Sequence, residues 1–272
     1  MSAKLIFYKL PETREEGGNT MLRKGLIIYE SKGRAQEYCP LALNLYRGCA
    51  HFCLYCYAPD ATFMDTETFK KAVPRENIIE KLKKDAPKAA ADGATGNILL
   101  SFTSDCYQPI NDIHQLTRQA IIILHRHGFK VTILTKGGHR AIQDFDILGP
   151  GDQFATTLTL LDEKQSLEWE PQAAIPVDRI ETLRYAHDLG IETWVSLEPV
   201  IDPEVTLEII RQTHTFVDLF KVGKLNYSEK LPEPYRSQVK DIDWRKFAKD
   251  VTAVLNEYGC QSYIKQDLRR YL

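Results

Sequence analysis

Three of the six cysteines lie within eight residues of one another, at Cys49, Cys53 and Cys56, in the segment RGCAHFCLYCYAP. Thiolates at this density are typical ligands of a metal ion or an iron–sulfur cluster. Structural zinc usually takes two short pairs of ligands, and no second pair follows, although His51 or Cys39 could supply a fourth ligand. Iron–sulfur clusters normally take four thiolates, so three would leave one iron of a four-iron cluster open to a substrate or cofactor. The spacing favours the open cluster, with zinc and a chance arrangement as the alternatives.

The composition describes a globular chain with little net charge. The 272 residues include 35 Lys and Arg against 37 Asp and Glu, and 43% of them are hydrophobic. No apolar run reaches the roughly 18 residues that a membrane span needs, and the N-terminus has no secretion signal. We therefore expect a cytoplasmic monomer with reduced thiols and no membrane contact. The formal net charge of -2 gives no general attraction for nucleic acid.

The elements that must position the cysteines follow a simple rhythm, in which short β-rich segments alternate with segments of helical period. We expect strands over 26–30, 41–46, 97–102, 130–135, 154–160, 192–197, 218–223 and 262–265, and helices over 113–127, 177–188, 204–213 and 243–258. The units are too few for a closed eight-unit barrel of about 250 residues. The pattern predicts an α/β fold with parallel strands, as an open or partial barrel or a doubly wound sheet. Residues 39–272 would form one domain after an N-terminal extension, residues 1–38.

Polar side chains follow nearly every predicted strand, at the ends where parallel α/β folds place their sites. These side chains are Thr103, Ser104, Asp105, Cys106, Lys136, Thr157, Thr159, Ser196, Glu198, Lys221, Lys224 and Lys265. Because the cysteine loop follows the first predicted strand, it would share one rim with them. Ser104 and Asp105 could instead cap the next helix. Glu198 would be costly to bury without a partner, and Lys221 or Lys224 could supply one.

The cysteine spacing, with Tyr55 before the last cysteine, resembles that of the radical S-adenosylmethionine (radical SAM) enzymes. Further segments are similar to the spore photoproduct lyase-like branch, often labelled DNA repair photolyase. They are GRAQEY (33–38), LSFTSDCYQPI (100–110), ILTKGG (133–138), WEP (169–171), TWVSLEPVIDP (193–203) and FKVGKLNY (220–227). The resemblance covers roughly residues 25 to 270.

The resemblance implies a partial (β/α)6 TIM-type barrel with a [4Fe-4S] cluster on Cys49, Cys53 and Cys56. Its open iron would chelate the amino and carboxylate groups of S-adenosylmethionine, and one electron from a flavodoxin- or ferredoxin-type donor would yield methionine and a 5′-deoxyadenosyl radical. That radical would abstract a hydrogen atom from a substrate that the sequence does not identify. The residues expected around the cofactor are Tyr55, Ser104, Lys136, Thr157, Arg179 and Glu198. Those expected to face the substrate are Asp105, Cys106 and Lys224.

The chain departs from the family at one position that matters for the substrate. In spore photoproduct lyase a cysteine just before the TSD triplet returns a hydrogen atom to the product radical, whereas this chain has Phe102 there and Cys106 just after the triplet. Cys106 is a candidate hydrogen donor from a shifted position, although a lone cysteine is usually a small buried hydrophobe. DNA lesion repair is one hypothesis, and the near-neutral charge argues against it. The alternatives are radical modification of a peptide, RNA or small metabolite, and a non-catalytic iron–sulfur or zinc binding protein.

Overall fold

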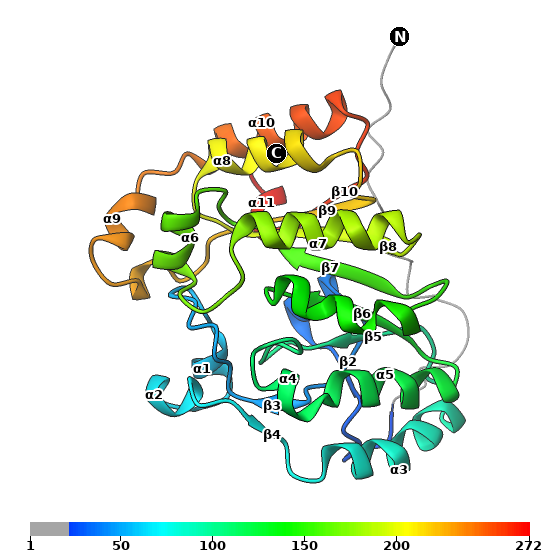
Figure 1. The fold of residues 1–272 in the computed structure, drawn as a ribbon. Helices are drawn as coiled ribbons and strands as arrows, with labels where there is room; N and C mark the ends of the chain where they lie inside the picture. Colours follow the sequence, from blue (N-terminus) through cyan, green and yellow to red (C-terminus); the bar gives the residue numbers. More distant parts are fainter. Residues whose placement is uncertain (1–21) are drawn as a thin grey trace.

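The computed structural model describes residues 22–272, and an eight-stranded sheet organises them (Figure 1). The strands in spatial order are β1 (Tyr29–Glu30), β2 (Leu41–Ala42), β5 (Asn97–Leu100), β6 (Lys130–Thr135), β7 (Gln153–Thr157), β8 (Glu192–Val200), β9 (Leu219–Lys224) and β10 (Ser262–Ile264). All neighbours run parallel except β1 and β2. This confirms the predicted α/β fold. Residues 1–21 of the expected N-terminal extension lie outside the described residues.

Helices connect the parallel strands and cover the outside of the sheet. The main ones are α3 (Ile78–Ala91), α5 (Leu116–Arg126), α7 (Pro176–Asp188), α8 (Pro203–Thr213) and α10 (Trp244–Glu257), and a 3-10 segment, η2 (Gly138–Ile147), links β6 to β7. In Figure 1, α8 and α10 lie together above the sheet, while α3 and α5 lie below it. No helix of residues 22–272 is long and apolar enough to cross a membrane.

Helix α10 shows why these segments fold as they do. Phe247, Val251 and Leu255 recur at helical spacing, and all three are buried against the sheet. The side chain of Asp243 caps the first turn by accepting hydrogen bonds from the backbone N–H groups of the second and third helical residues. Gly259 follows the helix with φ +66°, a left-handed conformation that glycine adopts without steric cost.

The expected strand over 41–46 is broken in the structure, which corrects that prediction. The chain leaves the sheet after Leu43, and only β3 (Tyr46–Arg47) resumes extended pairing, with β4 (Val73–Pro74) in a separate two-stranded sheet. The cause is Asn44, whose side-chain oxygen accepts hydrogen bonds at 3.0 Å from the backbone N–H groups of Phe102 and Thr103. This turn directs the following residues, including all three clustered cysteines, across the ends of the strands.

A short 3-10 turn, η1 (Gly33–Glu37), joins the two sides of the open barrel. Lys221 of β9 donates hydrogen bonds to the carbonyl oxygens of Glu37 and Tyr38, at 3.2 and 2.9 Å. The backbone N–H of Gln266, just after β10, donates to the Glu37 carboxylate at 2.9 Å. The described residues before position 38 therefore contribute to the same barrel. The division of the chain at that position stays a prediction.

Candidate functional site

Backbone hydrogen bonds hold the loop that carries the three cysteines. Gly48 begins it with φ +78°, where a Cβ would collide with the carbonyl oxygen of Phe69. The N–H of Cys49 donates to that oxygen at 2.9 Å, and the N–H of Leu54 donates to the carbonyl of Trp169 at 2.9 Å. These contacts fix the path of the loop between β3 and α1 (Ala58–Ala61).

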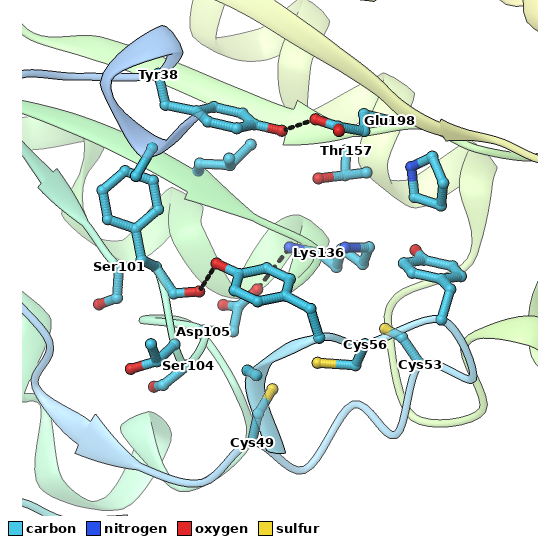
Figure 2. Close-up of a pocket in the computed structure, with 18 of the residues that line it drawn as sticks. Tyr38, Cys49, Cys53, Cys56, Ser101, Ser104, Asp105, Lys136, Thr157 and Glu198 are labelled. Carbon is cyan, nitrogen blue, oxygen red and sulfur yellow. Dashed lines mark hydrogen bonds between the residues drawn. The ribbon is translucent and has the colours of Figure 1, made fainter. Parts of the chain in front are cut away.

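The cysteines form one wall of a cavity of 530 Å³ (Figure 2). Cys49, Cys53 and Cys56 each keep part of their surface exposed to it. Figure 2 shows Tyr38 and Glu198 on the opposite wall, with Lys136 and Thr157 from the ends of β6 and β7 between the two walls. A cavity of several hundred cubic ångströms is the usual size for a small-molecule or cofactor site.

The three thiols are of a type that can bind iron, because thiolates are the usual ligands of iron–sulfur clusters. Among residues 22–272, no three His, Cys, Asp or Glu side chains come together closely enough to hold one metal ion. Zinc would need its thiolates at about 2.3 Å from one centre, whereas a four-iron cluster binds thiolates at separate corners. Burial, partly opposed by Lys136, raises the pKa of Cys53 to about 12. These thiols would ionise on binding a metal, which deprotonates a coordinating thiol.

Tyr55 connects the cysteine loop to a buried ion pair that includes Glu170 of the WEP segment (169–171). Glu170 and Arg179 form a buried ion pair at 2.5 Å, and the Tyr55 hydroxyl donates a hydrogen bond to Glu170. Burial alone would raise the pKa of Glu170, but Arg179 and Lys136 hold it below its usual value. Arg179 also donates to the carbonyl of Thr157 at 3.0 Å and is only 1% exposed. The structure therefore places Arg179 behind the strand ends rather than on the cavity wall.

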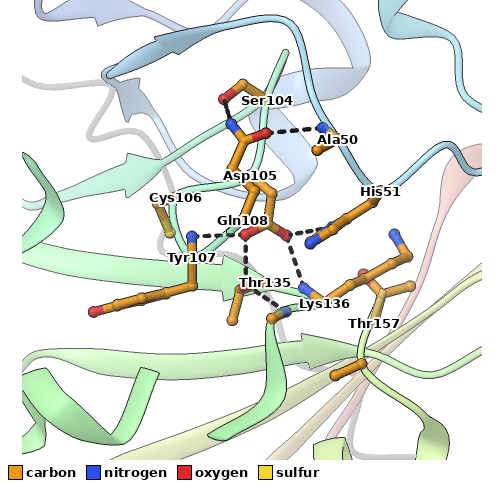
Figure 3. A network of polar contacts seen from close by, with 12 residues as sticks. Ala50, His51, Ser104, Asp105, Cys106, Tyr107, Gln108, Thr135, Lys136 and Thr157 are labelled. Carbon is orange, nitrogen blue, oxygen red and sulfur yellow. Dashed lines mark hydrogen bonds and ion pairs between the residues drawn. The ribbon is translucent and has the colours of Figure 1, made fainter. Parts of the chain in front are cut away.

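Asp105 ties the cysteine loop to β6 (Figure 3). Its carboxylate accepts hydrogen bonds from the N–H of Tyr107 at 2.8 Å, the hydroxyl of Thr135 at 2.6 Å and the N–H of Lys136 at 2.8 Å. The imidazole Nδ1 of His51 lies 3.4 Å from the same carboxylate. Asp105 is 8% exposed, so most of its hydrogen-bonding capacity serves this chain rather than a ligand.

Gln108 makes a second link to the loop that the sequence interpretation missed. Its side-chain oxygen accepts from the N–H of Ala50 at 2.8 Å, and its amide nitrogen donates to the carbonyl of Gly48 at 3.4 Å and to the hydroxyl of Ser104 at 3.3 Å. The side chain has no exposed surface. The sequence signal that could have identified Gln108 is its position three residues after the TSD triplet. A side-chain amide that is buried there needs hydrogen-bond partners, and the nearby loop can supply them.

Cys106 does not lie on the cavity wall. It is fully buried in the main core, and its thiol donates to the carbonyl of Leu100 at 3.2 Å. Phe102, at the position where the resemblance led us to look for a cysteine, does line the cavity.

The wall opposite the cysteines contains a group of polar side chains around the half-buried Glu198. Tyr38 donates a hydrogen bond to Glu198 at 2.5 Å, and Lys265 forms an ion pair with it. The partner is thus neither Lys221 nor Lys224, which corrects that expectation. Lys221 points toward η1, where burial lowers its pKa to about 8. Lys224 contributes to the cavity lining, with its ammonium 5.2 Å from the ring centroid of a tryptophan of α10.

Most of the predicted site residues meet around one cavity. Those that line it are Cys49, Cys53, Cys56, Tyr55, Ser104, Asp105, Lys136, Thr157, Glu198 and Lys224. Of the residues expected around the cofactor or facing the substrate, Arg179 and Cys106 do not line it, and of the other strand-end residues expected on the rim, Thr159, Ser196 and Lys221 do not. Tyr38 also lines the cavity and was not predicted, because it lies in the segment expected to be an N-terminal extension.

Comparison with known proteins places the chain in a family. The family model of the radical SAM superfamily matches residues 43–217, and the chain therefore belongs to this superfamily. Uncharacterized protein MJ0683 of Methanocaldococcus jannaschii is 28% identical over 192 residues, covering 68% of this chain and 70% of the relative. Uncharacterized protein ORF301 of Acidianus two-tailed virus is 27% identical over 184 residues, covering 63% and 59%.

Solved structures share the fold at low sequence identity. A spore photoproduct lyase mutant with bound AdoMet and dinucleoside spore photoproduct matches with a TM-score of 0.65 and 13% identity, over 86% of this chain and 78% of that one. SuiB of Streptococcus suis bound to S-adenosylmethionine matches with a TM-score of 0.60 and 15% identity, over 82% and 49%. The fold is the partial barrel of radical SAM enzymes. The chain is a radical SAM enzyme, and its family implies a four-iron cluster and S-adenosylmethionine.

Proposed function

We propose that Cys49, Cys53 and Cys56 hold a [4Fe-4S] cluster and that S-adenosylmethionine binds at its open iron. Together these groups would supply one-electron cleavage of the sulfonium to methionine and a 5′-deoxyadenosyl radical, which takes a hydrogen atom from the substrate. The observation that carries the proposal is the placement of three thiols on one wall of a 530 Å³ cavity.

The chain's own residues would bind and orient the cofactor. Lys136 places a cation in the cavity, and it suits a carboxylate or the charge of the thiolates. Thr157 and Ser104 line the cavity with hydroxyls that suit the ribose and other polar groups. Tyr55 separates the cavity from the buried Glu170 and keeps its hydroxyl turned toward that carboxylate.

The wall opposite the cysteines would contact the substrate and the part of S-adenosylmethionine that lies farthest from the cluster. We assign Glu198 to the former and Lys224 to the latter, with Asp105 fixing the loop between them. The hydrogen-donor role is not extended to Cys106, because its thiol is buried and bonded to a backbone carbonyl. Beyond the three clustered cysteines, no thiol of residues 22–272 lines the cavity. This favours a peptide, RNA or small metabolite over repair of a DNA lesion as the substrate.

The proposed chemistry also bears on the electron donor and the cellular compartment. Radical SAM enzymes need a reductant, and we propose a flavodoxin or ferredoxin as the one-electron donor. All six cysteines are free thiols in the structure, which agrees with a cytoplasmic protein. We further propose that the chain works as a monomer.

Anaerobic reconstitution with iron and sulfide tests the proposal directly. We expect about four irons per chain and a visible spectrum that changes when S-adenosylmethionine is added. The variant Cys53→Ala should fail to hold the complete cluster, while Cys106→Ala, a matched change outside the cavity, should hold it. One tightly bound zinc per chain and no iron would contradict the proposal.

A further inference from the structure

The lining of the 530 Å³ cavity is more basic than the chain as a whole. Five Lys and Arg side chains line it against two carboxylates, whereas the formal net charge of the chain is -2. The five cations are Lys32, Arg34, Lys136, Lys224 and Lys265. The excess of positive charge is therefore local to the cavity. A hollow lined by one sign of charge attracts ligands of the opposite sign.

Three of these cations are engaged by other groups. Lys265 forms an ion pair with Glu198, a carboxylate of the lining. Arg34 forms an ion pair with Asp267, which lies outside the lining. Lys136 is assigned to the cofactor under the proposed function. These three side chains therefore say little about the substrate.

The other two cations of the lining, Lys32 and Lys224, form no ion pair with a carboxylate of residues 22–272. Lys32 is exposed and Lys224 is half-buried, so a ligand can reach both. The ammonium of Lys224 lies 5.2 Å from the ring centroid of Trp244 and 5.8 Å from that of Tyr271. Aromatic faces attract a cation and restrict its position. Because the rings carry no net charge, they leave the charge of Lys224 without a counter-charge.

The segments that carry these two lysines are joined through the carboxylate of Asp267. It accepts hydrogen bonds from the guanidinium of Arg34, two residues after Lys32, and from the side-chain amide of Asn226 at 2.9 Å. The same amide donates to the carbonyl oxygen of Lys224 at 3.0 Å. The backbone positions of both lysines are thus fixed without the use of either ammonium group.

The cofactors of the proposed function leave the excess charge in place. A cluster held by thiolates carries net negative charge, and the sulfonium of S-adenosylmethionine offsets it. The amino and carboxylate groups of the same cofactor offset each other. The counter-charge for Lys32 and Lys224 must therefore come from another molecule in the cavity.

We propose that the substrate carries an anionic group, a phosphate or a carboxylate, which Lys224 and Lys32 bind. A lysine ammonium presents three hydrogen-bond donors and one positive charge, which suit the oxygens of either group. The inference rests on the proposed function, and it narrows the unidentified substrate to molecules that carry such a group.

Binding of simple anions tests the inference before the substrate is known. The probes are inorganic phosphate and succinate, titrated by anaerobic calorimetry into the oxidised, reconstituted protein with S-adenosylmethionine bound, at constant ionic strength. No turnover occurs in this state. We expect the wild type to bind at least one probe, and Lys224→Met to bind it about 10-fold more weakly. Lys32→Met should weaken the same binding.

Two control variants separate a specific contact from a general effect of charge. Lys224→Arg keeps the cation and should retain most of the affinity. Lys249→Met removes an exposed lysine of α10 that does not line the cavity, and it should bind the probes as the wild type does. Equal affinities of K224M and the wild type for both probes would overturn the inference, as would an equal loss in K249M or no binding to the wild type. Should K224M fail to fold, K32M serves in the same comparison.

The two probes also distinguish the source of the negative charge. A loss confined to phosphate assigns a phosphate group to the substrate, and a loss confined to succinate assigns a carboxylate. A loss for both supports a site that accepts either group.

The failure of the proposed function would be visible separately. If the wild type assembles no four-iron cluster or binds no S-adenosylmethionine, the proposed function is wrong, and the same titrations on the metal-free chain still decide whether Lys224 and Lys32 bind an anion. If the wild type does both and K224M binds the probes equally well, only the inference about the substrate is wrong. The iron content of K224M and its affinity for S-adenosylmethionine are measured alongside and should match the wild type.

Discussion

Breaking the buried ion pair between Glu170 and Arg179 is expected to destabilise the protein. Both side chains are almost completely buried, and they meet at 2.5 Å behind the cavity. Replacing Arg179 by methionine keeps much of the side-chain volume but leaves the carboxylate of Glu170 without its main counter-charge. Removing one partner of a buried pair typically costs about 3–5 kcal/mol. For a chain of this length we therefore expect the melting temperature to fall by about 6–20 °C.

A double-mutant cycle separates the charge from the other contacts of Arg179. Its hydrogen bonds to the carbonyl oxygens of Ala174 and Thr157 are lost in both the single and the double variant. Glu170→Gln combined with Arg179→Met removes the uncompensated charge as well. The double variant should be more stable than the sum of the single effects implies, by a coupling free energy of about 1–3 kcal/mol.

Urea denaturation of the metal-free protein under reducing conditions measures these free energies of unfolding. The reasoning is refuted if R179M loses less than about 1 kcal/mol, because a buried carboxylate that has lost its main counter-charge should cost more than that. Additive single effects, with no coupling between the two positions, would refute it equally.

The remaining predictions concern three other buried groups. Gln108→Met should fold but release its iron faster than the wild type under a chelator, because it loses the bonds that hold the cysteine loop; an equal rate would contradict this. Burial would raise the pKa of Asp152, yet hydrogen bonds from His125 and two backbone N–H groups hold it below its usual value. Its contribution to stability is therefore present above the unfolded pKa of about 3.9 and lost as the pH falls through the folded one. In Asp152→Asn the free energy of unfolding should therefore fall less steeply as the pH is lowered. The same fall as in the wild type would contradict this role of Asp152. Cys106→Ala should cost about 1–2 kcal/mol through a small cavity without changing 5′-deoxyadenosine release, and loss of that release would restore a catalytic role.

The sequence predicted what depends on local pattern. Period-2 and helical patterns located most of the sheet and its helices, and the spacing of Cys49, Cys53 and Cys56 identified the site. The break at Asn44 escaped prediction because its cause is a contact with Phe102 and Thr103, which are far away in the sequence.

The site details that differed from expectation are also long-range. The partner of Glu198 is Lys265, 67 residues later, and Tyr38 reaches the same carboxylate from 160 residues earlier. Such pairs follow from how strand ends converge in the barrel, which no local pattern encodes. Cys106 was expected on the rim because it follows a strand. The hydrogen bonds of Asp105 fix the turn so that the thiol faces the core.

The central claim is that three thiols hold a cluster at which S-adenosylmethionine is cleaved. Its most direct test is the release of 5′-deoxyadenosine from the reduced, reconstituted protein, measured chromatographically in the absence of air. We predict release from the wild type and from C106A, and none from C53A. Intact S-adenosylmethionine after prolonged reduction of a wild-type protein that carries its full iron content would contradict the claim.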